Sequence, residues 1–501
     1  MNTIRLIIHL SLFLFIAPTY IFATKVNPET ELKQQEKDFA LFRKALYTIE
    51  SKLDRRISID SIEKVLDFTE NAFRTTVLTA LDEFRLYARC INLIQSGHTQ
   101  AAPTKAVLKE YVLKAKSLPF DMVMVNKHLY VSGYEPPKGK SKNAPKSKKK
   151  LTDIPIGAEI IAIDGLSIAE WMTKIGQFIG SDEDEPVFEY FVAGQAFDFY
   201  RFLATEEHSE QLSVNYVVKR DTLAQTIQLT YPPLKLLQAR FKATEIQQEK
   251  DQKSLGTMKF IGSDVAYFRF PSFASAFGKG YTENLIKQFK KIKKKKKIET
   301  VVIDLRGNGG GNVQSELLSY FMEPAQIVGN YQIEKRLTRR QSKHIKKNDL
   351  FYRNYRKNIR QFKKMEKKFP DFKGQLITYP VDTSLIFHGN IIVLTDEATF
   401  SAASLLASQL KTFREAQIMG SRAGGSYYAC NAGTLTFELP HSGIRFILNP
   451  NSCTSTLDTT AIDPNMKDVD VEIVPEYDPK KNIYKKNWEA VVKTAIKNAP
   501  K

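Results

Sequence analysis

The chain has 501 residues, of which 43% are hydrophobic and 26% are charged. It is long enough for roughly two to four domains, and its composition excludes a chain that is disordered throughout. The net charge is +19, and much of it comes from lysine-rich runs at 138–150, 290–297 and 346–368. No recognition helix or aromatic platform accompanies these runs, so we interpret them as solvated surface and expect no specific nucleic-acid partner.

The first residues have the pattern of an export signal. Arg5 supplies a positive charge, the stretch 6–23 is mostly apolar, and Ala23 offers a small residue for cleavage. An uncleaved membrane anchor is the alternative, but Pro18 interrupts the apolar stretch and favours cleavage. We therefore expect a signal peptide at 1–23 and an exported protein, periplasmic or extracellular. No later stretch is long and apolar enough to span a bilayer, so membrane association is expected to be peripheral at most.

Residues 24–117 predict a helical N-terminal domain, because apolar side chains recur there at helical spacing. The last of these helical segments, 80–94, ends at Ser96 and Gly97, which act as a helix stop. His98 therefore follows in a loop, where its side chain can face a cleft.

Residues 118–235 predict a β-rich module. Apolar residues alternate from Val123 to Val131, as they do in a half-buried strand. Further on, a hydrophobic strand leads into an Asp164-Gly165 turn and a short helix through Trp171. A glycine, a strand and such a turn resemble the pattern of a PDZ domain. A helical insertion is expected at about 182–202.

Residues 236–501 alternate strands and helices, which predicts an α/β domain. Buried strands are expected at 265–270, 300–305 and 391–395, each followed by a helix. The stretch 332–374 is basic and helical, and we interpret it as a surface insertion.

Ser401 ends a segment that has the pattern of a strand, a short loop and a helix start. This places its hydroxyl at the positive end of a helix, and the backbone N–H of Ala402 can face the same point. The alternative is an ordinary helix N-cap serine.

A glycine-rich loop, 304–311, follows a buried strand with the sequence Asp-Leu-Arg-Gly-Asn-Gly-Gly-Gly. Glycines allow the backbone to approach another group closely. A phosphate-binding loop would have this character too, but the Gly-Lys-Ser/Thr that such loops need does not follow.

Three segments in this order, 304–311, 399–403 and 420–425, resemble the S41 family of serine peptidases. This family includes the C-terminal processing (tail-specific) proteases, the tricorn core and retinoid-binding relatives. The resemblance implies an α/β multidomain fold with a helical N-terminal region, a PDZ-like module and a crotonase-like (ββα) catalytic domain. It also implies Ser401 as the nucleophile and the Ala402 N–H as one oxyanion donor. Processing proteases carry proline where Gly309 stands, so the second donor is expected at Gly310 or Gly311.

The base differs from that of the processing proteases, which use a Ser–Lys dyad. In the aligned segment 420–426, Ser426 takes the place of the lysine and is at most an accessory residue. The tricorn-like branch instead uses a histidine that precedes a threonine, and His98-Thr99 matches this pattern, with His388 as the rival histidine. By the same resemblance, Asp458 is the expected acid of the triad and Asp463 the second candidate.

These expectations describe an exported serine endopeptidase acting on protein or peptide substrates, with the PDZ-like module binding a substrate tail by strand addition. The alternative is a non-catalytic protein on the same scaffold that binds a peptide or a lipophile. No metal or cofactor is expected, because metal-ligand spacings are missing from the sequence. Of the three cysteines, Cys430 and Cys453 could pair, or all three could remain unpaired.

Overall fold

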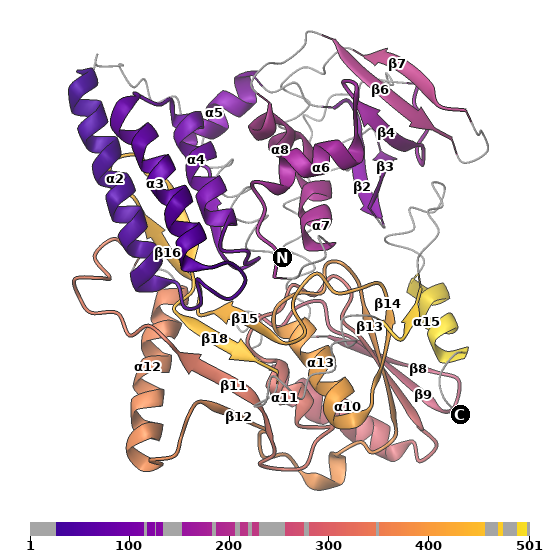
Figure 1. Cartoon of the computed structure of the whole chain (residues 1–501). Helices are drawn as coiled ribbons and strands as arrows, with labels where there is room; N and C mark the ends of the chain where they lie inside the picture. Colours follow the sequence, from indigo (N-terminus) through magenta and orange to yellow (C-terminus); the bar gives the residue numbers. More distant parts are fainter. Residues whose placement is uncertain are drawn as a thin grey trace, which may run out of the picture.

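The structure is a computed structural model (Figure 1), and it describes the residues 27–114, 118–125, 127–133, 153–182, 187–205, 211–218, 223–229, 256–274, 280–346, 350–455, 469–473 and 488–497. The expected signal peptide and the lysine-rich run 138–150 lie outside these ranges. Within them, no helix combines the length and the apolar character that crossing a membrane requires. The fold is a mixed α/β architecture built from helices and several separate sheets.

Four helices build the N-terminal part: α2 (Pro28–Ile49), α3 (Ile59–Thr75), α4 (Ala80–Asn92) and α5 (Lys105–Lys114). The first three begin with Asn27, Ser58 and Thr79, whose side chains accept hydrogen bonds from backbone amides of the first turn. Aromatic rings from each of these three helices pack together in the core. Helix α4 ends shortly before His98, and the short strand β1 (Gln100–Ala102) follows.

An antiparallel sheet in the order β2-β3-β4-β6-β7 forms the second part. Its strands are β2 (Asp121–Val125), β3 (His128–Gly133), β4 (Glu159–Ile163), β6 (Leu212–Val217) and β7 (Gln225–Leu229), and β5 (Leu166–Ser167) pairs with β4. The turn between β4 and β5 is Asp164-Gly165, with φ of 50° and 80°, as the sequence predicts. Three helices accompany the sheet: α6 (Ile168–Gly176), α7 (Val187–Gln195) and α8 (Phe197–Ala204).

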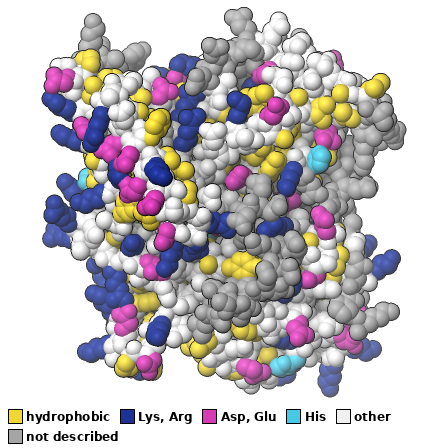
Figure 2. All heavy atoms as spheres, in the orientation of Figure 1, with side chains coloured by type: hydrophobic (Ala, Val, Ile, Leu, Met, Phe, Trp, Pro, Cys, Tyr) yellow, Lys and Arg dark blue, Asp and Glu magenta, His cyan; other side chains and the backbone are white. Residues whose placement is uncertain are grey.

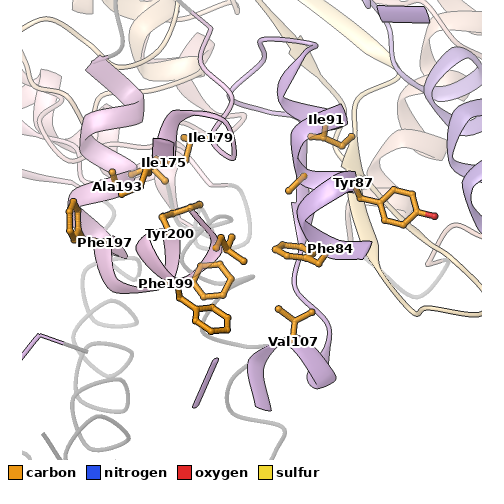
Figure 3. Packing of buried hydrophobic residues seen from close by; sticks show 14 of the residues in the cluster. Phe84, Tyr87, Ile91, Val107, Ile175, Ile179, Ala193, Phe197, Phe199 and Tyr200 are labelled. Carbon is orange, nitrogen blue, oxygen red and sulfur yellow. The ribbon is translucent and has the colours of Figure 1, made fainter. Parts of the chain in front are cut away.

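One hydrophobic core joins these first two parts. Phe84 and Ile91 on α4 face Ile179, Phe199 and Tyr200 from the α6–α8 region (Figure 3). The loop between α6 and α7 is thereby packed against the loop that carries His98. This packing brings a segment of the second part close to the candidate site.

The third part contains a mainly parallel sheet in the order β19-β14-β13-β10-β9-β8. The strands are β8 (Thr257–Ile261), β9 (Val265–Arg269), β10 (Thr300–Asp304), β13 (Asn390–Thr395), β14 (Gln417–Gly420) and β19 (Val471–Glu472), and β8 alone runs antiparallel to its neighbour. Helices α10 (Tyr281–Lys294), α11 (Gln314–Leu318) and α13 (Ala402–Arg414) follow strands of this sheet. Helix α11 is short, since it ends at Leu318 and the chain turns there.

Two smaller sheets complete the third part. One has the order β12-β11-β18-β15, with β11 (Ile327–Ile333), β12 (Gln375–Ile377), β15 (Ala429–Ala432) and β18 (Asn451–Thr454). The other has the order β1-β17-β16, with β16 (Leu435–Glu438) and β17 (Arg445–Leu448). Because β1 begins shortly after His98 and pairs with β17, this sheet connects the His98 loop to the third part of the chain.

The remaining described elements are the 3-10 helix η2 (Thr383–Leu385), helix α15 (Trp488–Lys497) and helix α12 (Leu350–Lys368). Helix α12 lies in the basic stretch that the sequence indicated as an insertion, and it stands at the periphery of the molecule (Figure 1). On the face drawn in Figure 2, lysine and arginine side chains are spread widely and are interspersed with acidic ones.

Candidate active site

Ser401 lies at the junction of β13 and α13, and its backbone conformation is unusual. Its φ is 58° and its ψ is −126°, a combination that residues other than glycine adopt only under strain. Although Ser401 occupies the N-cap position of α13, its side chain forms no capping hydrogen bond. The ordinary N-cap interpretation is therefore wrong, and the hydroxyl is held for another purpose.

The loop before Ser401 is fixed by the glycine-rich loop. The Phe400 N–H donates to the Asn308 carbonyl, and the Thr399 hydroxyl donates to the Leu305 carbonyl. The Asp396 carboxylate accepts hydrogen bonds from the backbone N–H groups of Gly307 and Ala398. These hydrogen bonds fix the loop that carries the strained serine. A strained backbone conformation persists only when the surrounding structure holds it in this way.

His98 reaches this serine from a position 303 residues earlier in the chain, with its Nε2 2.9 Å from the Ser401 Oγ. The imidazole lies against the ring of Phe400, with centroids 4.7 Å apart. The rival histidine, His388, is exposed and precedes β13, whereas Ser401 follows that strand. The two therefore lie at opposite ends of β13, so His388 is not placed at the serine.

The carboxylate beside His98 is that of Asp182, in the loop between α6 and α7. Its Oδ2 lies 3.1 Å from the His98 Nδ1, and its Oδ1 accepts a hydrogen bond of 2.8 Å from the Gly97 N–H. Burial raises the pKa of Asp182, but His98 and the Gly97 amide more than offset this, so the pKa is held below its ordinary value. The group is therefore ionised at neutral pH.

This arrangement determines the roles of the two ring nitrogens. An ionised carboxylate at Nδ1 requires a proton on that nitrogen, so we assign the tautomer in which Nε2 is unprotonated. Nε2 then accepts a hydrogen bond from the Ser401 hydroxyl. A serine hydroxyl hydrogen-bonded to a basic nitrogen, which is itself oriented by a carboxylate, has the geometry of an activated nucleophile.

Asp182 was not found from the sequence. It lies in an acidic run, 182–185, that matches no motif. The signal that it comes near His98 is structural: a Cβ on Gly180 would clash with the Ser96 carbonyl oxygen, so the two loops meet without room for a side chain. The predicted acid Asp458 and the second candidate Asp463 lie outside the described residues.

The candidate oxyanion donors lie in different settings. Ala402 is the first residue of α13, so its N–H belongs to the free amides of a helix N-terminus. Gly310 packs against the serine, since a Cβ on it would lie 2.7 Å from the Ser401 Cβ and 3.0 Å from the Ala402 nitrogen. The Gly310 N–H, however, donates to the Asn308 Oδ1 at 2.9 Å. Gly311 packs against the backbone of Phe273, which accounts for its lack of a side chain.

Ser426 has a local role in the structure. Its hydroxyl accepts hydrogen bonds from the N–H groups of Tyr428 and Ala429, and so shapes the entry into β15. The neighbouring Gly425 packs directly on the backbone of Ser401, where a Cβ would lie 2.7 Å from the Ser401 nitrogen. The segment therefore reaches the serine, as the aligned motif suggested, but it brings a turn-forming hydroxyl where processing proteases have an amine.

Cys430 on β15 places its thiol beside the Ser401 hydroxyl. Burial, with Cys453 and Asp182 nearby, raises the pKa of this thiol well above its ordinary value. The thiol therefore stays protonated and does not compete as a nucleophile. Cys430 and Cys453 are register partners on β15 and β18, and the chain's three cysteines are all buried and unpaired.

Comparisons with known proteins place the serine and the glycine-rich loop in one family domain. The model of Peptidase family S41 matches residues 264–444. A search of curated proteins gives no match. Among solved structures, mature CPAF is similar over 93% of this chain and 97% of that chain, with 15% identity and a TM-score of 0.57. Mature CPAF complexed with lactacystin is similar over 93% of this chain and 98% of that chain, with 14% identity and a TM-score of 0.56. A CPAF mutant is similar over 94% of this chain and 99% of that chain, with 14% identity and a TM-score of 0.59. At these identities the likeness concerns the fold.

Proposed function

The chain belongs to peptidase family S41 and is a serine peptidase, and from this premise we propose that it is an endopeptidase that cleaves protein or peptide substrates through an acyl-enzyme. The observation that carries the proposal is the line of contacts from Asp182 through His98 to Ser401. It supplies the nucleophile, the base and the orienting carboxylate in one place.

In the proposed reaction, the Ser401 Oγ attacks the carbonyl carbon of the scissile bond and His98 Nε2 takes its proton. Asp182 holds the Nδ1 proton and stabilises the imidazolium that forms. Nε2 then returns the proton to the leaving amine nitrogen as the C–N bond breaks. A water molecule attacks the resulting ester, with the same histidine as base, and regenerates the Ser401 hydroxyl.

The oxyanion of the tetrahedral intermediate forms beside the N-terminus of α13. The Ala402 N–H and the helix dipole favour negative charge there. A second donor from Gly310 requires its N–H to leave the Asn308 side chain. We propose that substrate binding drives this exchange.

The antiparallel sheet is the proposed PDZ-like module, and the domain around Ser401 the proposed crotonase-like catalytic domain. Strand addition of a substrate tail needs a free sheet edge. In the order β2-β3-β4-β6-β7, strand β2 packs against α7, where Gly194 contacts Met124. Strand β7 is the opposite edge and its side chains are mostly exposed, so we propose it as the binding edge.

Export is proposed from the N-terminal sequence alone. Expression of the full chain in a bacterium, followed by mass spectrometry of the purified protein, should give a new N-terminus after Ala23. An intact N-terminus in the cytoplasmic fraction would reject export.

The activity is tested with a fluorophosphonate probe and with a mixture of peptides blocked at both termini. We expect Ser401 to be labelled and the blocked peptides to be cleaved internally, and both signals to vanish in Ser401→Ala. Cleavage confined to residues at a free terminus would reject the endopeptidase assignment. A folded wild-type protein with neither signal would favour the non-catalytic binding protein.

A further inference from the structure

A fully buried carboxyl group, that of Glu50, is linked to the proposed catalytic residues through their neighbours in the chain. It is the C-cap residue of α2, and its backbone N–H donates to the Leu46 carbonyl, which ends the helix. No solvent reaches its side chain. A buried carboxyl is costly unless hydrogen bonds satisfy it, so its partners indicate what it does.

Three donors from three different segments converge on this carboxyl group. The Thr99 hydroxyl donates to Oε1 at 2.9 Å, and the Asn431 Nδ2 donates to the same oxygen at 2.6 Å. The Asn449 backbone N–H donates to Oε2 at 2.9 Å. All three donor residues are buried, so they have few alternative partners.

One of these contacts leads to the proposed base. Thr99 follows His98, and the Asn449 Nδ2 donates both to the Thr99 hydroxyl at 3.1 Å and to the His98 carbonyl at 3.0 Å. A closed ring of hydrogen bonds therefore joins Glu50, Thr99 and Asn449. Asn449 connects this ring to the backbone carbonyl of His98. The side chain of His98 contacts Ser401, while its backbone is held by the hydrogen bond from Asn449.

Another contact leads to the proposed nucleophile. Asn431 lies on β15 next to Cys430, whose thiol lies beside Ser401. The Asn431 bond to Glu50 thus fixes the strand that borders the serine. The carboxyl group is the common point of the His98 loop and the serine side of the site.

We infer that Glu50 is a positioning residue that sets the separation of His98 and Ser401 by bonding to the segments that flank each of them. The inference rests on the proposed function of these two residues as base and nucleophile. Glu50 touches neither the substrate nor the reacting atoms, so its effect is expected on the rate of the chemical step rather than on substrate binding.

A carboxylate suits this position better than an amide. Above about pH 7, where Glu50 is ionised, both of its oxygens accept, whereas a glutamine has one accepting oxygen and one donating nitrogen. In Glu50→Gln the amide nitrogen would face either the Asn449 N–H or the Thr99 and Asn431 donors. With the nitrogen toward Asn449, two donors face each other in a site that excludes water. With the nitrogen toward Thr99 and Asn431, the Thr99 hydroxyl must accept and the Asn431 amide must turn over, so the bonds to both flanking segments are rearranged.

The test uses hydrolysis of a peptide that the wild type cleaves, with kcat and KM measured separately well below the unfolding temperature. We expect Glu50→Gln to lower kcat by about 10- to 100-fold, because a shift on the order of 1 Å between reacting groups has this effect. KM should change less than about threefold, and the rate of fluorophosphonate labelling should fall in parallel with kcat.

The matched control is Glu83→Gln. Glu83 is a second buried glutamate of the helical part, and burial raises the pKa of both Glu50 and Glu83 to about 7. Glu83 lies in the first turn of α4, so it is nine residues, or about 14 Å, from the end that leads to His98. A purely structural role of Glu50 predicts equal effects of the two substitutions on kcat at equal folded fraction, and that result would overturn the inference.

Thr99 provides an independent arm, which also decides the question if Glu50→Gln does not fold. Thr99→Val removes the hydroxyl at constant shape, and Thr99→Ser retains it. We expect Thr99→Val to lower kcat at least about fivefold and Thr99→Ser to keep kcat within about twofold of the wild type. Equal kcat for the two variants would contradict the role of the hydrogen bonds that join Glu50, Thr99 and Asn449. In a double-mutant cycle, Glu50→Gln with Thr99→Val should be no slower than the slower single variant, because both break the same link.

Failure of the proposed function has a different signature. If Ser401→Ala hydrolyses the peptide as fast as the wild type, the assignment of the nucleophile is wrong. If hydrolysis depends on Ser401 but Glu50→Gln matches Glu83→Gln in kcat, only the positioning role is rejected.

Discussion

The imidazole of His98 lies on the ring of Phe400, the residue that immediately precedes the serine to which it is hydrogen-bonded. The two centroids are 4.7 Å apart, and the ring of Phe400 also stacks on Phe188 of α7, with centroids 4.2 Å apart. A side chain at Gly97 would strike Phe400, so the glycine is what allows the ring to approach the His98 loop. Segments from all three parts of the fold therefore meet in one stack beside the nucleophile.

Shortening this stack should impair catalysis more than stability. Phe400→Leu keeps a buried apolar side chain but removes the flat surface that orients the imidazole, so we expect kcat/KM to fall about tenfold or more. A substitution of this size in a core costs on the order of 1–2 kcal/mol, which leaves the chain folded at 25 °C. Steady-state kinetics with a thermal unfolding curve tests this. Phe191→Leu, on the same helix as Phe188, is the control and should retain kcat.

Ser401 should be replaceable without loss of stability. Because its side chain caps nothing and its φ is 58°, glycine at this position relieves strain and should raise the free energy of unfolding by up to about 1 kcal/mol. Ser401→Ala should be close to neutral. Both variants are expected to be inactive, and denaturant titrations of the three proteins measure the difference. If Ser401→Gly clearly lowered the free energy of unfolding, the backbone of Ser401 would not be strained.

The serine and the histidine could be predicted from the sequence because each lies in a short segment that resembles a motif of the S41 family, and the structure shows the local geometry that these segments serve. Ser401 follows a buried strand and opens a helix, and Gly97 beside His98 is forced by the Phe400 ring. The parallel strands could be predicted from their composition, since β10 and β13 are buried on both faces and form continuous apolar runs in the sequence.

Asp182 and Glu50 could not be predicted, because nothing near them in the sequence indicates their partners. Asp182 becomes buried only when the α6–α7 loop packs on Ser96, and Glu50 only when its helix end meets segments about 50 and 400 residues away. An acidic residue in a polar run normally remains in water. Its functional setting is a product of tertiary packing, which spacing rules do not encode.

The buried glutamates should make the protein more stable at mildly acidic pH. Burial raises the pKa of Glu50 and Glu83 from 4.5 to about 7, so the folded state binds protons more tightly than the unfolded state. Their contribution is fully present below about pH 4.5 and is lost as the pH rises through 7. We expect the free energy of unfolding to fall from pH 5 to pH 8, on the order of 1 kcal/mol or more for each group.

Urea titrations at pH 5 and pH 8 measure this slope, and Glu83→Gln should flatten it. Asp182 acts in the opposite sense, since its pKa is lowered in the folded state. Its contribution is present at neutral pH and is lost only as the pH falls below its ordinary value of 3.8. A free energy of unfolding that rises from pH 5 to pH 8 would contradict the burial of the two glutamates.

A comparison of Asp182→Asn with Asp458→Asn can decide which carboxylate orients His98. The Asp182 carboxylate accepts from His98 Nδ1 and from the Gly97 N–H, so an asparagine there can keep its oxygen on only one of them. An amide nitrogen facing Nδ1 would stabilise the tautomer with the proton on Nε2, and His98 could no longer accept the serine proton. We expect kcat to fall on the order of 10³- to 10⁴-fold, with KM little changed. Asp458→Asn, which tests the acid suggested by the sequence, should retain kcat within about threefold. If instead Asp458→Asn is the slow variant and Asp182→Asn remains active, Asp182 is a structural partner of the His98 loop, and the acid that orients His98 comes from the segment that contains Asp458.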